Sequence, residues 1–150
     1  MKTSTTTRRL LAVGSVAAVA GTSINAAVYG IARAAGVSFV VSGQKPGADH
    51  VLLQHVLSLS LFSFAAGIVA ALVVARLRRP SLRALQVLGG ALAVISTVMD
   101  LQIESAIGAV TLASMHLVVG ASYVVGLGLA QRPTAAVVET DEPVLLSAAA

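Results

Sequence analysis

Four long apolar runs, almost free of charge, constrain this chain more than any other feature of its sequence. They occupy about residues 10–33, 51–76, 82–103 and 106–130. Each is long enough to cross a roughly 30 Å hydrocarbon core, which takes about 20 helical residues. Backbone polar groups must satisfy one another in lipid, so the runs should be helical. The sequence therefore predicts an all-α protein, a four-helix transmembrane bundle with up-down-up-down order.

The composition excludes a soluble fold. Apolar residues make up 57% of the 150 residues and charged residues only 11%, whereas about a quarter of an ordinary soluble domain is charged. A soluble domain of this size has too small an interior to bury so much apolar surface. We therefore expect the lipid bilayer to be the main partner. The chain has no cysteine, which excludes disulfides and thiolate metal sites.

The orientation follows from the lysines and arginines beside the runs. One side holds the two termini and the loop between the second and third runs, with Lys2, Arg8, Arg9, Arg76, Arg78, Arg79, Arg83 and Arg132. The other side holds only Arg33 and Lys45. This bias predicts that both termini are cytoplasmic and that the protein lies in the cell membrane. Residues 1–9 would be a cytoplasmic segment, and residues 132–150 a mobile cytoplasmic tail.

Three further features of the chain have competing interpretations. The first 20 residues resemble a cleavable signal peptide, but the apolar run continues past Ala20, which favours a retained helix. Residues 37–41 mix strand-forming side chains with turn formers, and we expect a plain loop there rather than a short extended lid. The basic clusters contain no interleaved aromatic residues, so no nucleic-acid partner is expected.

Polar side chains inside the runs define a candidate intramembrane site. Asn25, Tyr29 and Arg33 share one helix face, and His116 and Tyr123 share another. His116 lies roughly 15 Å deep and Asn25 about 12 Å deep at 1.5 Å per residue, which predicts a hydrogen bond between them. A structural bond that fixes helix register is favoured. The alternative is the floor of an outward-facing ligand or proton site that includes both tyrosines.

Charged side chains at the outer rim form a second candidate group. We expect Arg33 to pair with Asp100 and Glu104 and so to join the first run to the third. The rim of a cation or substrate entrance is the alternative. No metal site is expected, because His50 and His55 are five residues apart and helical ligand pairs need a spacing of four. No catalytic motif or cofactor-binding motif is present, so we expect no enzyme and no cofactor.

Small residues at a spacing of four, such as Gly67 and Ala71, predict close packing between helices of the same chain. Gly126 and Gly128 could equally serve a homo-oligomer. Among functions, a structural or accessory protein that binds a protein partner or lipid is favoured. A small transporter or channel component, with a polar cavity above His116, is the alternative. A membrane enzyme is the least favoured.

Three stretches of the chain support a resemblance to other proteins. They are residues 25–37 (NAAVYGIARAAGV), the Arg78–Arg79 turn and residues 113–121 (ASMHLVVGA), whose MHLVxGA segment is the most specific. Through them, roughly residues 8–131 resemble a family of small four-span membrane proteins of high-GC, actinobacterial-type bacteria, a domain of unknown function. The resemblance implies four helices and a recurring asparagine and histidine, here Asn25 and His116. It implies no activity.

Overall fold

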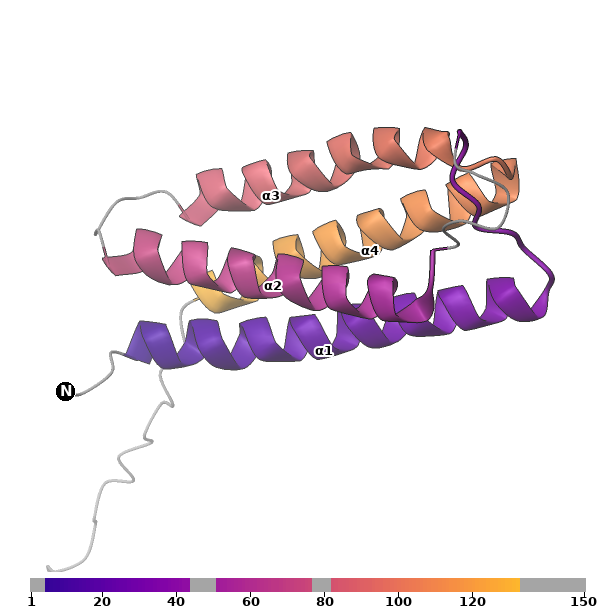
Figure 1. Cartoon of the computed structure of the whole chain (residues 1–150). Helices are drawn as coiled ribbons and strands as arrows, with labels where there is room; N and C mark the ends of the chain where they lie inside the picture. Colours follow the sequence, from indigo (N-terminus) through magenta and orange to yellow (C-terminus); the bar gives the residue numbers. More distant parts are fainter. Residues whose placement is uncertain (1–4, 44–50, 77–81, 133–150) are drawn as a thin grey trace, which may run out of the picture.

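The computed structural model describes residues 5–43, 51–76 and 82–132. Within them the chain forms helices α1 (Thr5–Ala34), α2 (Leu53–Arg76), α3 (Leu82–Ser96) and α4 (Ala106–Gln131), which run alternately up and down (Figure 1). A 3-10 helix, η1 (Thr97–Gln102), continues α3. All four helices, α3 taken with η1, are long and apolar enough to cross a membrane. The predicted four-helix bundle is confirmed, and the chain is a multi-pass membrane protein.

Two helix ends differ from the prediction. α1 begins at Thr5 rather than near residue 10, so Arg8 and Arg9 belong to its first turns. The third run is an α-helix only to Ser96, and η1 replaces its last turns. A 3-10 helix has three residues per turn, so the side chains of η1 point in directions that an α-helix would not give them. The predicted tail beyond Arg132, together with Lys45 and His50, lies outside the described residues.

The helices do not pack evenly around the bundle. α1 packs along both α2 and α4, and α3 packs along α4, whereas α2 and α3 touch much less. α1 begins where α4 ends, at what we call the termini end (Figure 1). There the Arg9 guanidinium donates hydrogen bonds to the carbonyls of Leu129, at 3.0 Å, and Arg132. These bonds help to satisfy the backbone carbonyls at the C-terminus of α4.

The opposite end of the bundle is covered by residues 37–42, which we call the lid. Val41 pairs with Ile103 in an isolated antiparallel bridge, so this segment is extended rather than the plain loop that we favoured from the sequence. The lid buries Phe39 completely, and its ring stacks on Tyr29 with 5.1 Å between the ring centroids. Tyr29, Phe39 and Ile103 belong to one apolar cluster that closes this lid end.

Large apolar side chains cover the outside of the bundle. Leu101 is 77% exposed, and Phe62 and Val87 are each 73% exposed. A soluble protein rarely exposes a contiguous apolar surface of this kind, but lipid chains cover it in a membrane. The interior is mostly apolar, and the buried polar residues among those described are Thr22, Asn25, Ser60 and Asp100.

Candidate functional site

Asn25 forms a polar centre among three helices. It is 1% exposed. Its side-chain amide donates to the hydroxyl oxygen of Ser60 on α2, at 3.1 Å, and to the carbonyl of Met115 on α4, at 3.3 Å. Its amide oxygen and the hydroxyl of Thr22, one turn away, are both buried and have no hydrogen-bond partner among the described residues. This centre ties α1 to α2 and α4 inside the bundle.

His116 forms a second polar centre with Asp100. The imidazole Nδ1 lies 2.9 Å from a carboxylate oxygen of Asp100, which joins α4 to η1. The Asp100 side chain is 8% exposed and that of His116 is 40% exposed. Nε2 makes no hydrogen bond with another described residue. A carboxylate that holds one ring nitrogen orients the imidazole and leaves the other nitrogen able to exchange a proton or meet a ligand.

The predicted Asn25–His116 hydrogen bond is wrong. The two residues do lie against the same helix, because Asn25 bonds the backbone of Met115, the neighbour of His116. Successive side chains of an α-helix point about 100° apart. Asn25 therefore meets α4 on the side of α1, and the imidazole of His116 points away toward η1. The sequence indicates how deep each residue lies in the membrane. It does not indicate how α4 is rotated about its own axis, which decides the neighbour that each side chain faces.

The predicted ion pair of Arg33 with Asp100 and Glu104 is also wrong. Asp100 instead forms an ion pair with His116. Asp100 is buried because η1 turns its side chain inward onto α4. Arg33 and Glu104 are exposed. The backbone amide of Glu104 instead donates to the carbonyl of Val40, at 3.0 Å, and so helps to hold the lid.

The two tyrosines lie in different parts of the bundle. The hydroxyl of Tyr29 donates to the carbonyl of Val51, at 2.8 Å, at the lid end. Tyr123 lies nearer the termini end, where its hydroxyl donates to the carbonyl of Gly67, at 3.4 Å. Its ring occupies the space that a side chain at Gly67 or Gly89 would need. Tyr123 thus fills the gap between α2 and α3 in that half and belongs to a different centre from His116.

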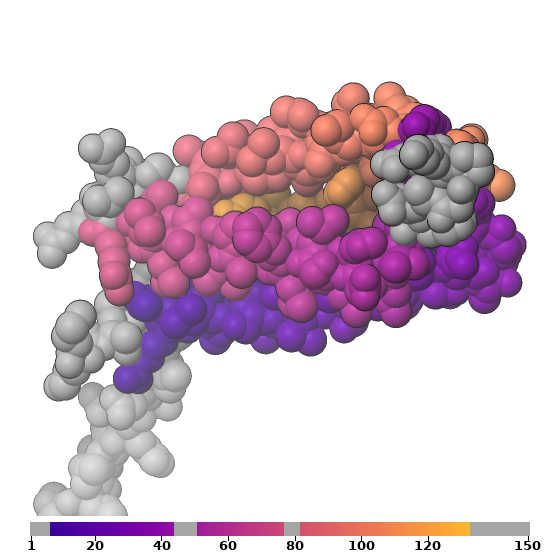
Figure 2. Space-filling model, viewed as in Figure 1, coloured from indigo at the N-terminus to yellow at the C-terminus, as the bar shows by residue number. Residues whose placement is uncertain are grey.

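The gap between α2 and α3 continues past Tyr123 toward the lid end. Figure 2 shows the surface hollowed between these helices, with α4 at the floor. His116 precedes Tyr123 by seven residues, two helical turns, and therefore projects into the same gap. The same helical spacing places two serines on the faces that border this gap. Ser63 of α2 lies one turn from Gly67, and Ser96 of α3 lies two turns from Gly89. Leu59 lies one turn before Ser63 and Leu92 one turn before Ser96, and both are exposed. We call the region marked by these four residues the α2–α3 groove.

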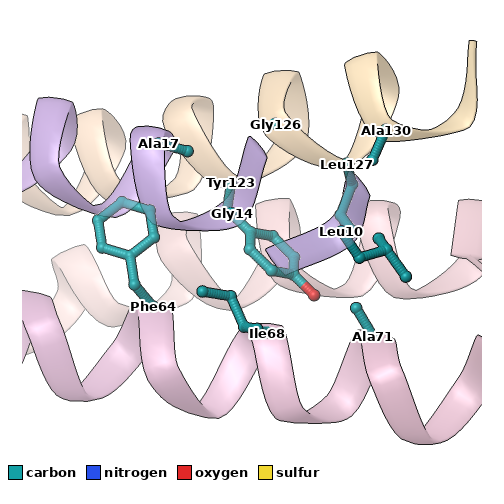
Figure 3. A pocket seen from close by; sticks show the side chains of 10 residues that line it. All are labelled: Leu10, Gly14, Ala17, Phe64, Ile68, Ala71, Tyr123, Gly126, Leu127 and Ala130. Atoms are coloured by element: carbon teal, nitrogen blue, oxygen red, sulfur yellow. The ribbon is translucent and has the colours of Figure 1, made fainter. Parts of the chain in front are cut away.

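Two other hollows of the bundle are apolar. A cavity of about 20 Å³ lies between α1, α2 and α4 near the termini end and is lined by residues such as Phe64, Ile68 and Leu127 (Figure 3). An apolar cavity of this size stays dry. A shallow groove of about 370 Å³ runs between α1 and α4. Its two hydroxyls, Thr111 and Ser114, donate to carbonyls of their own helix, so lipid chains suit it.

Sequence reasoning missed Ser60 and Phe39. Ser60 is one of three serines in ten residues of α2, and no sequence signal separates it from its exposed neighbours Ser58 and Ser63. Ser60 lies four residues from both Val56 and Phe64, and so shares a helix face with them. This spacing identifies Ser60 only once the structure shows that Val56 and Phe64 are buried residues of α2. Phe39 is one of three phenylalanines in the chain. An aromatic residue between turn formers is typical of a lid that packs onto a core.

The profile of a family described as "Family of unknown function (DUF6069)" matches residues 5–133. The chain belongs to this family. The match spans all four helices of this DUF6069 member, the lid and the His116–Asp100 pair. It confirms the predicted membership of an uncharacterised family. No curated protein and no solved structure matches the chain.

Proposed function

We propose that this chain is an accessory protein of the cell membrane, without catalytic activity, that binds a transmembrane helix of a partner protein in the α2–α3 groove. One observation supports this above the others: the imidazole of His116 is 40% exposed. It lies two turns from Tyr123 on the face of α4 that meets both α2 and α3, and these two helices touch each other little. A polar group that faces hydrocarbon is stabilised by any partner that hydrogen-bonds it. A helix with one polar side chain would supply that partner, and its small residues would allow close approach.

A photoreactive amino acid can test this proposal in the native membrane. We expect the crosslinker at Ser63, in the groove, to form an adduct with one membrane protein. The matched control is Val69 of the same helix, which lies two residues past Gly67, about 200° around, and is 59% exposed. The control position should give lipid adducts only. Replacing Leu92 with Trp should fill the groove and remove the protein adduct. Identical adducts at Ser63 and Val69 would exclude a groove-specific partner.

The orientation that we propose places the termini end in the cytoplasm. It is supported by the excess of basic residues on that side, which includes Arg9, Arg76 and Arg132. Because the chain has no cysteine, a single Ser42→Cys change in the lid provides a clean label. An impermeant maleimide should label this cysteine in intact cells, whereas a cysteine at Arg132 should react only after the membrane is opened. The reverse pattern would invert the topology.

Transport is the second candidate function, and the polar floor of the groove favours it. Asp100 and His116 are the only acid and imidazole of the described spans that bond each other, and such pairs mark proton paths in some transporters. Purified protein in liposomes would then show proton or cation flux that His116→Gln abolishes. Liposomes without flux at any pH would leave the accessory role as the better account.

The absence of catalysis is part of the same proposal. An imidazole held by a carboxylate acts as a base when a nucleophile bonds its other nitrogen. The hydroxyl of Ser96 donates instead to the carbonyl of Ala93, at 2.8 Å, and that of Ser114 to Thr111, at 2.6 Å. Ser60 is engaged by Asn25. None of these three hydroxyls is oriented toward His116 as a nucleophile.

A further inference from the structure

The His116–Asp100 pair is the one side-chain hydrogen bond that joins η1 to α4 among the described residues. α3 has no buried residue, and it meets α2 only weakly. Its continuation η1 is joined to α4 by the 2.9 Å contact of the pair. The lid adds a second link, because the amide of Ser42 donates to the carbonyl of Gln102, at 2.6 Å. η1 also packs against α4, and the polar contact of the pair adds to that packing and helps to set the position of η1, which continues the lid-end wall of the α2–α3 groove.

The charge of this pair depends on one proton. With one proton shared between them, the two groups are neutral overall, either as imidazolium and carboxylate or as imidazole and carboxylic acid. Without it, a carboxylate that is 8% exposed carries an uncompensated negative charge in the membrane. A charge in that environment is strongly disfavoured. Because Nδ1 of His116 and the carboxylate oxygen of Asp100 are 2.9 Å apart, a proton between them is bonded to one group and hydrogen-bonded to the other.

The other described titratable or charged side chains at the lid end are not partners of His116 or Asp100. At the lid end the described ones are Tyr29 and Arg33 of α1, His55 of α2 and Glu104 after η1. Tyr29 donates to Val51, and Nδ1 of His55 accepts from the amide of Leu52, at 3.2 Å. Arg33 and Glu104 are exposed. No group of three or more His, Asp or Glu residues forms among the described residues.

We propose that His116 and Asp100 form a proton-binding site whose single proton holds η1 against α4, and that loss of this proton lets η1 move away and widens the α2–α3 groove. Without the proton, the ionised carboxylate is stabilised by moving toward water or lipid headgroups at the nearby lid end. This inference builds on the proposed function, because η1 continues one wall of the proposed binding groove. In this inference, proton binding by the His116–Asp100 pair controls the width of the groove.

Distances between spin labels in the purified protein, reconstituted without any partner, test this site. One label pair spans the lid end, at Ile31→Cys on α1 and Leu101→Cys on η1, which are 71% and 77% exposed. The control pair spans the other half, at Val16→Cys and Val87→Cys, which are 69% and 73% exposed. Between about pH 5 and about pH 9, we expect the lid-end distance to lengthen by about 2 Å or more. The control distance should stay constant.

The Asp100→Asn variant separates proton binding from general loosening. Its amide can still bond the imidazole but cannot become ionised, so the lid-end distance should no longer change with pH. The unchanged control distance verifies in the same sample that the bundle is folded. A pH-independent lid-end distance in the parent protein would overturn the proposal, as would an equal change at both label pairs or a pH response that survives Asp100→Asn. Because no partner is present, none of these results depends on whether a partner helix binds.

Discussion

Replacing Gly67 with alanine should destabilise the bundle because Tyr123 occupies the space that the new methyl group needs. The added Cβ would lie 2.5 Å from Cε2 and 3.0 Å from Cδ2 of the Tyr123 ring, whereas carbon atoms in contact prefer about 3.5–4.0 Å. The ring cannot retreat, because it also fills the corresponding space at Gly89 on α3. Overpacking of this kind typically costs about 1–3 kcal/mol. We expect Gly67→Ala to lower the free energy of unfolding by that amount.

Gly30→Ala is the matched control for this change. Gly30 lies in the body of α1, and a Cβ there would meet nothing within 4 Å. Alanine should therefore be neutral or should stabilise by up to about 1 kcal/mol, since glycine is the poorer helix former. Equilibrium unfolding in mixed micelles of a mild detergent and dodecyl sulfate measures both variants against the parent protein.

The double variant shows whether the tyrosine ring is the cause. In a Tyr123→Val background the ring is absent, so Gly67→Ala should become neutral or stabilising. The coupling between the two positions should reach about 1 kcal/mol or more, as expected for residues in direct contact. The reasoning fails if Gly67→Ala is as harmless as Gly30→Ala, or if its effect is the same with and without the tyrosine.

Four further single substitutions address other parts of the fold, and all are measured by the same unfolding assay. Asn25→Ala and Ser60→Ala should each destabilise, and their double-mutant coupling should be about 0.6 kcal/mol, typical of a hydrogen bond between membrane helices; zero coupling would contradict the 3.1 Å bond between them. Phe39→Ala should cost about 3–5 kcal/mol, because the side chain is fully buried against Tyr29; a loss below about 1 kcal/mol would show that the lid does not pack. Gly36→Ala should lower the free energy of unfolding by about 1 kcal/mol, because Gly36, just after α1, has a φ of 79° that alanine adopts only with strain. Gly30→Ala is again the control, and equal effects of the two substitutions would refute the strain at Gly36.

The fold could be predicted from the sequence to a large extent, but the candidate site could not. Run length and the absence of charge predict four membrane helices whatever their arrangement, because lipid admits few other structures. The depth of Asn25 and of His116 follows from counting residues along a helix. Their partners do not, because Met115 and His116 are at nearly the same depth and only the rotation of α4 decides which of them faces α1.

The sequence by itself determined that this protein crosses the membrane four times, and it singled out Asn25, His116 and Asp100 as polar residues in apolar surroundings. Only the tertiary structure decided that His116 pairs with Asp100, because the 3-10 turns of η1 redirect a carboxylate that a continuous helix would place elsewhere. It also decided that α2 and α3 stand apart over part of their length. Hydrophobic patterning cannot specify such a gap, because a side chain that faces lipid and one that faces another helix are both apolar.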